Sequence, residues 1–340
     1  MNSFGRIFRI HIFGESHGEC VGLTIDGCPA GLPLAVEDFL VDIERRKGGL
    51  QKGTTPRKED DIPIFKTGLF NGHTTGAPLT ILFENNNTRS GDYEKQQAVP
   101  RPGHADFTAH AKYGGFQDFR GGGHFSGRLT VCLVAAGVVA KKLLSFTHPC
   151  PSREGIKIIS TLLEIGGETD LEKGLDKAIE AKDSIGGIVE CKASGLPVGL
   201  GDHFFNSVES LLSHAVFAIP AVKGVEFGAG FAAAKMFGVE HNDAIENASG
   251  KTKTNHAGGV VGGITNGNEL VYRIVIKPTS STPKEQQTWN RETNEVESFS
   301  VKGRHDLCIA LRVPVILEAV TAMVLADLML LDQKIKPVLV

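Results

Sequence analysis

Glycine is unusually frequent in this chain, and much of it stands beside charged or imidazole side chains. The sequence has 41 glycines in 340 residues, about 12% against a usual share of roughly 7%. Because glycine adopts backbone conformations closed to other residues, and lets the chain approach a ligand closely, this pattern predicts many tight loops. Where histidine or arginine flanks such a loop, we expect a binding or catalytic role. The apolar content of 41% is ample for a buried core.

Hydrophobic patterning predicts a chain of mixed α and β structure. Strands are expected at 7–13, 21–25, 79–84, 157–164, 186–192 and 270–277, and helices at 36–46, 129–144 and 207–218. The apolar run 313–331 is long enough for a membrane span, but Glu318 and Asp327 interrupt it, so a buried helix is expected. The polar stretches 48–61, 85–103 and 279–300 are predicted to be loops. No linker or repeat divides the chain, which favours one α+β domain over residues 1–340.

Charge and cysteine usage narrow the partners and the compartment. The formal net charge of −3 does not favour nucleic acid or an anionic membrane, and one Trp and three Tyr leave few platforms for stacking bases. The chain begins without the long apolar core of a secretory signal. Six scattered cysteines without metal-type spacing indicate reduced thiols in a cytoplasmic protein: Cys20, Cys28, Cys132, Cys150, Cys191 and Cys308.

Five loops combine glycine or hydroxyl residues with histidine, arginine or lysine: 14–18, 101–106, 120–128, 277–281 and 303–306. Histidine transfers protons near neutral pH, and arginine binds anions through two parallel hydrogen bonds. The glycines at 121–123 precede a predicted helix, where backbone N–H groups and the helix dipole favour an anion. Each loop alone also fits an ordinary turn or a glycine hinge, and the basic residues at 45–47 and 52 also fit a solvated face.

Together these loops concentrate positive charge in a chain whose net charge is negative. Such a distribution suits a substrate that carries phosphate and carboxylate groups. The sequence contains neither a P-loop nor a dinucleotide-binding fingerprint. From the residues alone, the prediction is an enzyme that binds anions and uses imidazole groups as acids or bases, with the reaction left open.

The same loops, in this order, resemble the signature segments of the chorismate synthase family: FGESHG, ERRKGG, TTGAP, RPGHADFT, DFRGGG, AVKGVEFG, NHAGG, GGIT, KPTSS and GRHD. The match is colinear from about Phe4 to the C-terminal helix. It implies a single-domain α+β sandwich of β-sheets and α-helices, usually a homotetramer with FMN close to subunit contacts. It also implies 1,4-anti elimination of phosphate from 5-enolpyruvylshikimate 3-phosphate to give chorismate. That reaction needs reduced FMN (FMNH2) without net redox change, and NADPH is a candidate reductant.

Carried over by position, the resemblance implies roles for individual residues. His17 would protonate or stabilise the reduced flavin, His104 would act as acid toward the departing phosphate, and Asp306 would assist the final hydrogen transfer near the flavin. The implied cofactor-binding positions are His124, Phe125, Ser126, Ala221, Gly262, Lys277, Pro278, Thr279, Ser280, Ser281 and Arg304. The implied positions for substrate or NADP are Arg46, Lys52 and Arg101. No metal ligand is implied.

The chain departs from the family pattern mainly after its glycine run. His124 stands where the family usually has arginine, and Leu129 where it has glutamate, so two opposite charges are lost together. We expect His124 and Arg120 to share the anion contact of the missing arginine. Pro220 replaces a frequent asparagine, and Leu307 replaces a usual proline.

Two other interpretations of the sequence stay open: a flavin- or phosphate-binding protein without catalysis, and an FMN reductase that uses NAD(P)H.

Overall fold

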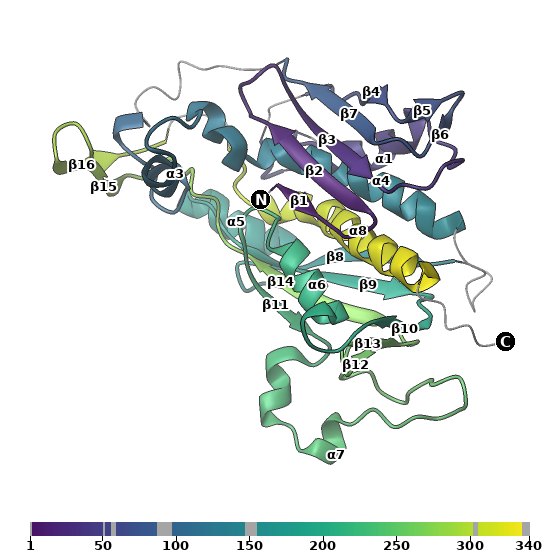
Figure 1. The fold of residues 1–340 in the computed structure, drawn as a ribbon. Coiled ribbons are helices and arrows are strands. Elements are labelled where there is room, and N and C mark those ends of the chain that lie inside the picture. Colours follow the sequence, from purple (N-terminus) through teal and green to yellow (C-terminus); the bar gives the residue numbers. More distant parts are fainter. Residues whose placement is uncertain are drawn as a thin grey trace.

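The structure is a computed structural model that describes residues 2–49, 52–55, 59–86, 97–146, 155–301 and 305–334. Two antiparallel sheets lie on either side of a pair of long helices, so the molecule is layered (Figure 1). The helices are α4 (Thr130–Phe146) and α8 (Val313–Lys334), and they pack against each other. The α+β sandwich predicted from the sequence is confirmed.

The two sheets hold most of the strands. The N-terminal sheet has the order β1-β2-β3-β7-β4, with bounds Ser3–Phe4 (β1), Arg9–Gly14 (β2), Cys20–Asp26 (β3), Leu79–Glu84 (β7) and Ile64–Thr67 (β4). The second sheet has the order β11-β14-β9-β8, with bounds Val222–Phe227 (β11), Leu270–Ile276 (β14), Gly187–Ser194 (β9) and Lys157–Ile165 (β8). Buried and less buried residues alternate along β7 and β14, so one face of each sheet lies in the core.

Shorter elements surround these layers. The helices are α1 (Glu37–Arg46), α3 (Asp106–Tyr113), α5 (Leu171–Ala181), α6 (Val208–Val216) and α7 (Gly238–His241). The short strands are β5 (Leu69–Phe70), β6 (His73–Thr74), β10 (Val198–Gly201), β12 (Val260–Val261) and β13 (Ile264–Asn266). The 3₁₀ helices are η2 (Arg120–Phe125), η3 (Gly127–Leu129), η4 (Phe204–Asn206), η5 (Gly230–Lys235) and η6 (Ile309–Arg312). A hairpin of β15 (Gln286–Asn290) and β16 (Glu295–Phe299) projects from the body (Figure 1).

Helices α4 and α8 are mostly apolar on all sides, which is typical of helices buried in a core. They come close where Gly137 faces Ala319, because a Cβ added to Gly137 would lie only 2.2 Å from the Cβ of Ala319. The segment Ile309–Asp332 is long and apolar enough to cross a membrane, but 94% of its most apolar window is buried inside the molecule. The buried C-terminal helix predicted from the sequence is confirmed.

Glu318, one of the two charges that interrupt this apolar run, is 3% exposed in the middle of α8. Its carboxylate accepts hydrogen bonds from Arg45 (2.7 and 2.8 Å), from Lys141 (3.0 Å) and from the Ser160 N–H (3.1 Å). Burial raises the pKa of Glu318, but the bonds from Arg45 and Lys141 outweigh it and hold the pKa below its usual value. The charge therefore joins α8 to α1, α4 and β8.

Most elements expected from the sequence are present with ends shifted by a few residues, but the loop predicted over 279–300 is wrong. This stretch contains the β15–β16 hairpin. Two contacts with residues distant in the sequence hold it: the Arg291 N–H donates to the Ala98 carbonyl (3.0 Å), and Trp289 packs edge to face against Phe107. Contacts with distant residues produce no periodic pattern in the local sequence, so the hairpin was not predicted. Parts of the predicted loops 48–61 and 85–103 lie outside the described residues.

Five of the six cysteines fall within the described residues, and all five are free thiols. Cys28, Cys132, Cys191 and Cys308 are buried. Burial raises the pKa of Cys28 to about 11 and that of Cys132 to about 12. The Cys28 and Cys132 thiols are therefore protonated at neutral pH. Cys150 lies outside the described residues.

Candidate active site

A cavity of about 530 Å³ lies where segments distant in the sequence meet. Its lining comes from segments far apart in the chain: residues 2–4, strand β2, residues 103–105, residues 124–127 and 129, the start of α4, helix α6, Ala218, Pro220, Ala221, Lys277, Thr279, Ser280, Ile309 of η6 and helix α8. The volume falls in the usual range of small-molecule sites, about 300–1,000 Å³. Three of the five loops singled out in the sequence, 101–106, 120–128 and 277–281, contribute residues to this lining.

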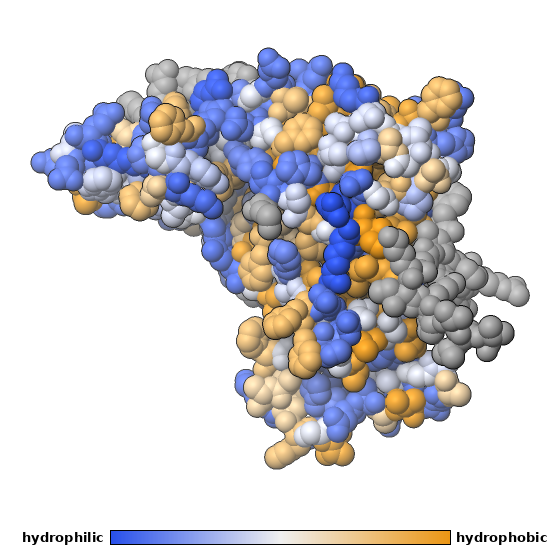
Figure 2. All heavy atoms as spheres, viewed as in Figure 1, coloured by the Kyte–Doolittle hydropathy of each residue, from blue (hydrophilic) through white to orange (hydrophobic). Residues whose placement is uncertain are grey.

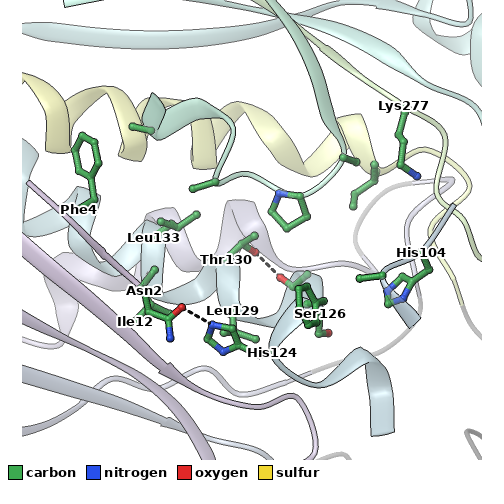
Figure 3. A pocket seen from close by; sticks show the side chains of 18 of the residues that line it. Asn2, Phe4, Ile12, His104, His124, Ser126, Leu129, Thr130, Leu133 and Lys277 are labelled. Carbon is green, nitrogen blue, oxygen red and sulfur yellow. Dashed lines mark hydrogen bonds between the residues drawn. The ribbon is translucent and has the colours of Figure 1, made fainter. Parts of the chain in front are cut away.

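The cavity has an apolar part and a polar part (Figure 3). Phe4 and Leu133 lie at one side, with the aliphatic side chains of Ile10 and Met323 in the same lining. His104 and Lys277 lie together at the other side. Such a cavity suits a flat apolar ring system together with an anionic group.

Arg101, His104 and Asp106 form one hydrogen-bonded group at the polar end. Arg101 donates from Nε to Asp106 Oδ2 (2.7 Å) and from Nη2 to Asp106 Oδ1 (2.8 Å), and His104 Nδ1 lies 2.5 Å from the same Oδ1. Burial raises the pKa of Asp106, but the hydrogen bonds from Arg101 and His104 outweigh it and hold this pKa well below its usual range. The ionised carboxylate therefore orients the imidazole and favours a proton on its Nδ1.

The glycine run 121–123 lies against both histidines that the sequence points to. A Cβ added to Gly121 would lie 2.4 Å from Cδ2 of His17, and one added to Gly122 would lie 3.2 Å from Cε1 of His104. Both glycines have positive φ, +60° and +81°, a conformation that residues with a side chain rarely adopt. His104 lines the cavity, whereas His17 is 7% exposed, lies behind Gly121 and is not part of the described lining.

His124, which replaces the arginine expected at this position, is held by the N-terminal sheet. Its Nδ1 donates to the Gly14 carbonyl (2.9 Å), and its Nε2 lies 3.2 Å from Oδ1 of Asn2 (Figure 3). Because a carbonyl oxygen only accepts, Nδ1 carries a proton. Arg120 instead forms a two-bond ion pair with Asp118 (2.8 and 2.9 Å). Arg120 is thus engaged by a carboxylate of the chain itself, and the sharing of an anion contact by His124 and Arg120 stays a prediction.

The loop 277–281 is joined to the loop 101–106 by side-chain hydrogen bonds. Ser280 Oγ donates to the Gly103 carbonyl (2.8 Å), and Arg101 Nη1 donates to Ser281 Oγ (3.3 Å). Gly103 has a φ of +73°, so its carbonyl reaches this position in a turn that glycine permits. The two predicted anion-binding loops thus form one wall at the polar end.

Lys277 brings a positive charge to the cavity. Its Nζ donates to Ser280 Oγ (3.2 Å), and its side chain is part of the lining. Burial, and then repulsion by Lys223, lower the pKa of Lys277. Ala221, also in the lining, has a φ of +72°. Backbone strain of this kind at a residue with a side chain is often found at functional sites.

Arg46, the last residue of α1, is buried against the turn that precedes α4 and is not part of the described lining. It is 3% exposed, and its guanidinium donates to Asp61 (3.0 Å), Thr130 Oγ1 (2.9 Å) and the Arg128 carbonyl (3.1 Å). Arg128 also forms an ion pair with Asp61, so one carboxylate joins two guanidinium groups. Burial raises the pKa of Asp61, but these cations outweigh it and lower the pKa. Arg46 holds the turn that precedes α4.

Asp306 is also held by the protein. Its carboxylate accepts a hydrogen bond from the Thr55 N–H (2.8 Å) and pairs with Arg312 (3.1 Å). Arg312 in turn donates to the carbonyl of Arg46 (2.8 Å). Asp306 and Arg46 therefore belong to one polar network that lies outside the described cavity lining. Lys52 is exposed and pairs with Asp176 (2.6 Å).

The residues implied by the resemblance fall into groups by position. Those that line the cavity are His104, His124, Phe125, Ser126, Ala221, Lys277, Thr279 and Ser280. Arg101 contacts this lining through His104, since its Nη2 lies 2.9 Å from Nδ1 of that ring, and Ser281 accepts a hydrogen bond from Arg101 behind the lining. The described residues found elsewhere are His17, Arg46, Lys52, Gly262 in the turn between β12 and β13, Pro278 and Asp306. Arg304 lies outside the described residues.

The structure also places residues at the site that the sequence patterns missed. Phe4 and His214 face each other edge to face with ring centroids 5.4 Å apart, and both line the cavity. Asp61 is the last residue of the polar stretch 48–61 that was predicted to be a loop, yet its carboxylate is fully buried. Phe4 and His214 are 210 positions apart, so no local pattern could have indicated their contact.

The known proteins that this chain is similar to, in sequence and in structure, are chorismate synthases. The family model described as chorismate synthase matches residues 8–330. A chorismate synthase of Chitinophaga pinensis is 70% identical over 334 residues, covering 98% of this chain and 98% of the relative. A chorismate synthase of Dehalococcoides mccartyi is 45% identical over 97% of this chain and 96% of its own length. A solved structure described as a crystal structure of chorismate synthase superimposes with a TM-score of 0.72 at 26% identity, covering 98% of this chain and 94% of that one.

Proposed function

The chain belongs to the chorismate synthase family, and we propose that the 530 Å³ cavity is where its reaction takes place. The activity is that of a carbon–oxygen lyase of the shikimate pathway. One observation carries the assignment of the cavity. The hydrogen-bonded group Arg101, His104 and Asp106 meets Lys277 at the polar end of a largely apolar cavity.

The proposed substrate, 5-enolpyruvylshikimate 3-phosphate, carries a phosphate and two carboxylates, so it needs cations around it. Asp106 largely neutralises Arg101, because two nitrogens of the guanidinium bind its carboxylate. The net positive charge at this end therefore comes from Lys277 and from the proton on His104. Both side chains are partly buried, so water screens these attractions less than at the surface.

His104 is the proposed acid toward the departing phosphate. Asp106 holds the Nδ1 proton, which leaves Nε2 to carry the proton that is transferred to a phosphate oxygen. Because Asp106 stays ionised, it stabilises the imidazolium before the transfer. Gly122 lets the backbone pack beside this ring without a side chain in between.

The lining residues fit a reduced FMN. The apolar part near Phe4 and Leu133 suits a flat ring system, and the hydroxyl groups of Ser126, Thr279 and Ser280 suit a polar chain and phosphate. His124, Phe125 and Ala221 complete the proposed contacts. When bound, a reduced flavin supplies transient electron density that helps to expel phosphate without net redox change. The residues of the chain bind and orient the two molecules and exclude water.

The remaining implied residues are proposed to act from outside this cavity. His17 supports the glycine run beside His104, and Arg46 fixes the start of α4. Asp306, Lys52 and Gly262 are proposed to approach a ligand at a contact between copies of the chain in a homotetramer. Exposed apolar side chains on the projecting part around η5 and α7, in the lower part of Figure 2, support such a contact: Phe231, Phe237, Val239 and Ile245. A cytoplasmic location without nucleic-acid or membrane partners stays a prediction.

An anaerobic assay tests the proposed function. With dithionite-reduced FMN, the purified protein should convert the phosphorylated substrate to chorismate and free phosphate, and FMN should bind far more tightly once substrate is present. Absence of product would refute the proposal. An FMN reductase would instead oxidise NADPH without substrate, and a non-catalytic binding protein would bind FMN under every reductant without forming product. Running the assay with and without NADPH also decides whether the protein reduces its own flavin.

A further inference from the structure

We propose that Asp327 is a positioning residue for the cavity, because it fixes the N-terminal segment 2–4 that forms part of the lining. The carboxylate lies on α8, is 4% exposed, and accepts hydrogen bonds from three successive backbone N–H groups. Ile7 (2.7 Å), Phe8 (2.9 Å) and Arg6 (3.0 Å) donate to Oδ1, and Arg6 also donates to Oδ2 (3.1 Å). Converging N–H groups form an anion-binding concavity, which a carboxylate of the same chain fills here.

The turn that Asp327 holds is tight. Gly5 has a φ of +91°, and a Cβ added there would lie 2.0 Å from the Phe8 carbonyl oxygen. A turn of this shape points its N–H groups to one side, where those of Arg6 and Ile7 are partly buried and that of Phe8 is buried, so they need an acceptor. Asp327 supplies this acceptor from a helix more than 300 positions later in the sequence. The turn is therefore anchored to the core of the molecule.

The anchored turn decides where β1 lies. This edge strand pairs with β2 through only two residues, Ser3 with His11 and Phe4 with Ile10. A pairing this short holds little on its own, so the chain on each side must be fixed. Asp327 fixes the C-terminal side, and the contact between Asn2 and Nε2 of His124 (3.2 Å) lies on the N-terminal side.

The fixed segment shapes the apolar part of the cavity. Asn2, Ser3 and Phe4 all line it, and Phe4 lies at the side away from His104 and Lys277 (Figure 3). Asp327 is not part of the described lining. Loosening the segment should therefore weaken the binding of a ring system in the apolar part, while the Arg101, His104 and Asp106 group stays intact. The inference rests on the proposed function only for the identity of the ligands.

The variant Asp327→Asn tests this directly, since it keeps the shape but turns one acceptor oxygen into an N–H donor that faces other donors. Amide hydrogen exchange of residues 3–12 should rise about tenfold, because buried N–H groups lose their partner. The Kd for FMN in the presence of the phosphorylated substrate should also rise about tenfold, and kcat at saturation should fall by less than about threefold. Weaker FMN binding with a nearly unchanged kcat indicates that Asp327 positions the ligand, and that the acid His104 still works.

Glu318→Gln is the matched control. It also alters a buried carboxylate on α8, but its partners are Arg45, Lys141 and Ser160. It should lower the Tm and leave both the exchange of residues 3–12 and the Kd for FMN unchanged. Unchanged amide exchange of residues 3–12 in Asp327→Asn would overturn the proposal. The same holds if the Kd for FMN rises in both variants in proportion to their loss of Tm. Should the wild-type protein bind neither FMN nor substrate, the proposed function fails, and the exchange experiment still decides whether Asp327 holds the segment.

Discussion

Nδ1 of His104 lies 2.5 Å from Oδ1 of Asp106, and the same carboxylate binds the guanidinium of Arg101. One loop of six residues thus provides a proton donor, the carboxylate that orients it and a cation. The carboxylate keeps its charge at all but acidic pH, because its pKa is held well below the usual range. The negative charge of Asp106 therefore stays in place beside Arg101 and His104 at neutral pH.

His104→Ala should lower kcat by at least about 100-fold, since proton donation by a positioned side chain contributes roughly 10²–10⁴ in rate. The FMN affinity should change by less than about threefold, because His104 is one of many lining residues. Anaerobic turnover and a flavin titration measure the two effects. His203→Ala, at an exposed histidine paired with Asp202, is the control. Turnover that survives in His104→Ala would show that the acid is another group.

Asp106→Asn should change the acid stability of the protein. The folded pKa of Asp106 lies below the unfolded value of about 3.9, so its contribution is present above about pH 4 and is lost as pH falls through the folded pKa. The variant lacks this contribution and should be less stable at neutral pH by about 3 kcal/mol, because Arg101 keeps a buried unpaired charge. Urea unfolding midpoints between about pH 2 and 7 should converge for the two proteins at the acid end. Parallel curves would contradict this.

Gly121→Ala should destabilise the protein by about 1–3 kcal/mol, because the methyl group meets His17 at 2.4 Å and the backbone has a φ of +60°. Gly127→Ala is a control for stability in the same segment, because its φ is ordinary and nothing lies within 4 Å of the added Cβ. Thermal unfolding of both variants measures the difference. Equal Tm values would mean that the glycine run does not depend on its contact with His17.

Arg46 and Lys52 should differ sharply on replacement, although both are basic residues of the same region. Arg46→Met leaves the buried Asp61 with one cation fewer and should cost about 3 kcal/mol of stability. Lys52→Met removes only an exposed pair with Asp176 and should leave the Tm nearly unchanged. If Arg46→Met kept the wild-type Tm and raised only a ligand Kd, Arg46 would be a binding residue.

Lys277→Met should raise the KM for the phosphorylated substrate about tenfold, because a cation in the cavity is lost. Burial and Lys223 lower the pKa of Lys277, so its charge is lost at a lower pH than the usual lysine value of about 10.4. In the wild type, KM should therefore rise as pH increases toward that value, and the variant should lack this rise. Lys284→Met, at a lysine near Asp183, is the control. Identical pH profiles for Lys277→Met and wild type would contradict the assignment.

Much of the fold and part of the site follow from local patterns in the sequence. The all-round apolar character of 313–331 places α8 in the core, and β7 and β14 match the predicted strands. The loops 101–106, 120–128 and 277–281 combine glycine with imidazole or cationic groups, and the structure brings all three to one cavity. Their conformations are encoded largely locally, because the positive φ of Gly103, Gly121 and Gly122 is a conformation that strongly favours glycine.

Only the tertiary structure decides which of the basic and imidazole residues face the cavity. His17 and Arg46 carry the same local signals as His104 and Lys277, yet packing buries them behind Gly121 and beside Asp61. The contact of Asp327 with residues 6–8 likewise joins the two ends of the chain. Whether a side chain is buried, and which residue it pairs with, depends on which distant segments pack together. The same kind of glycine-rich loop can hold a side chain that faces a ligand or one that faces the core. The sequence by itself therefore determined the set of loops and their chemistry, and long-range packing assigned each side chain its place.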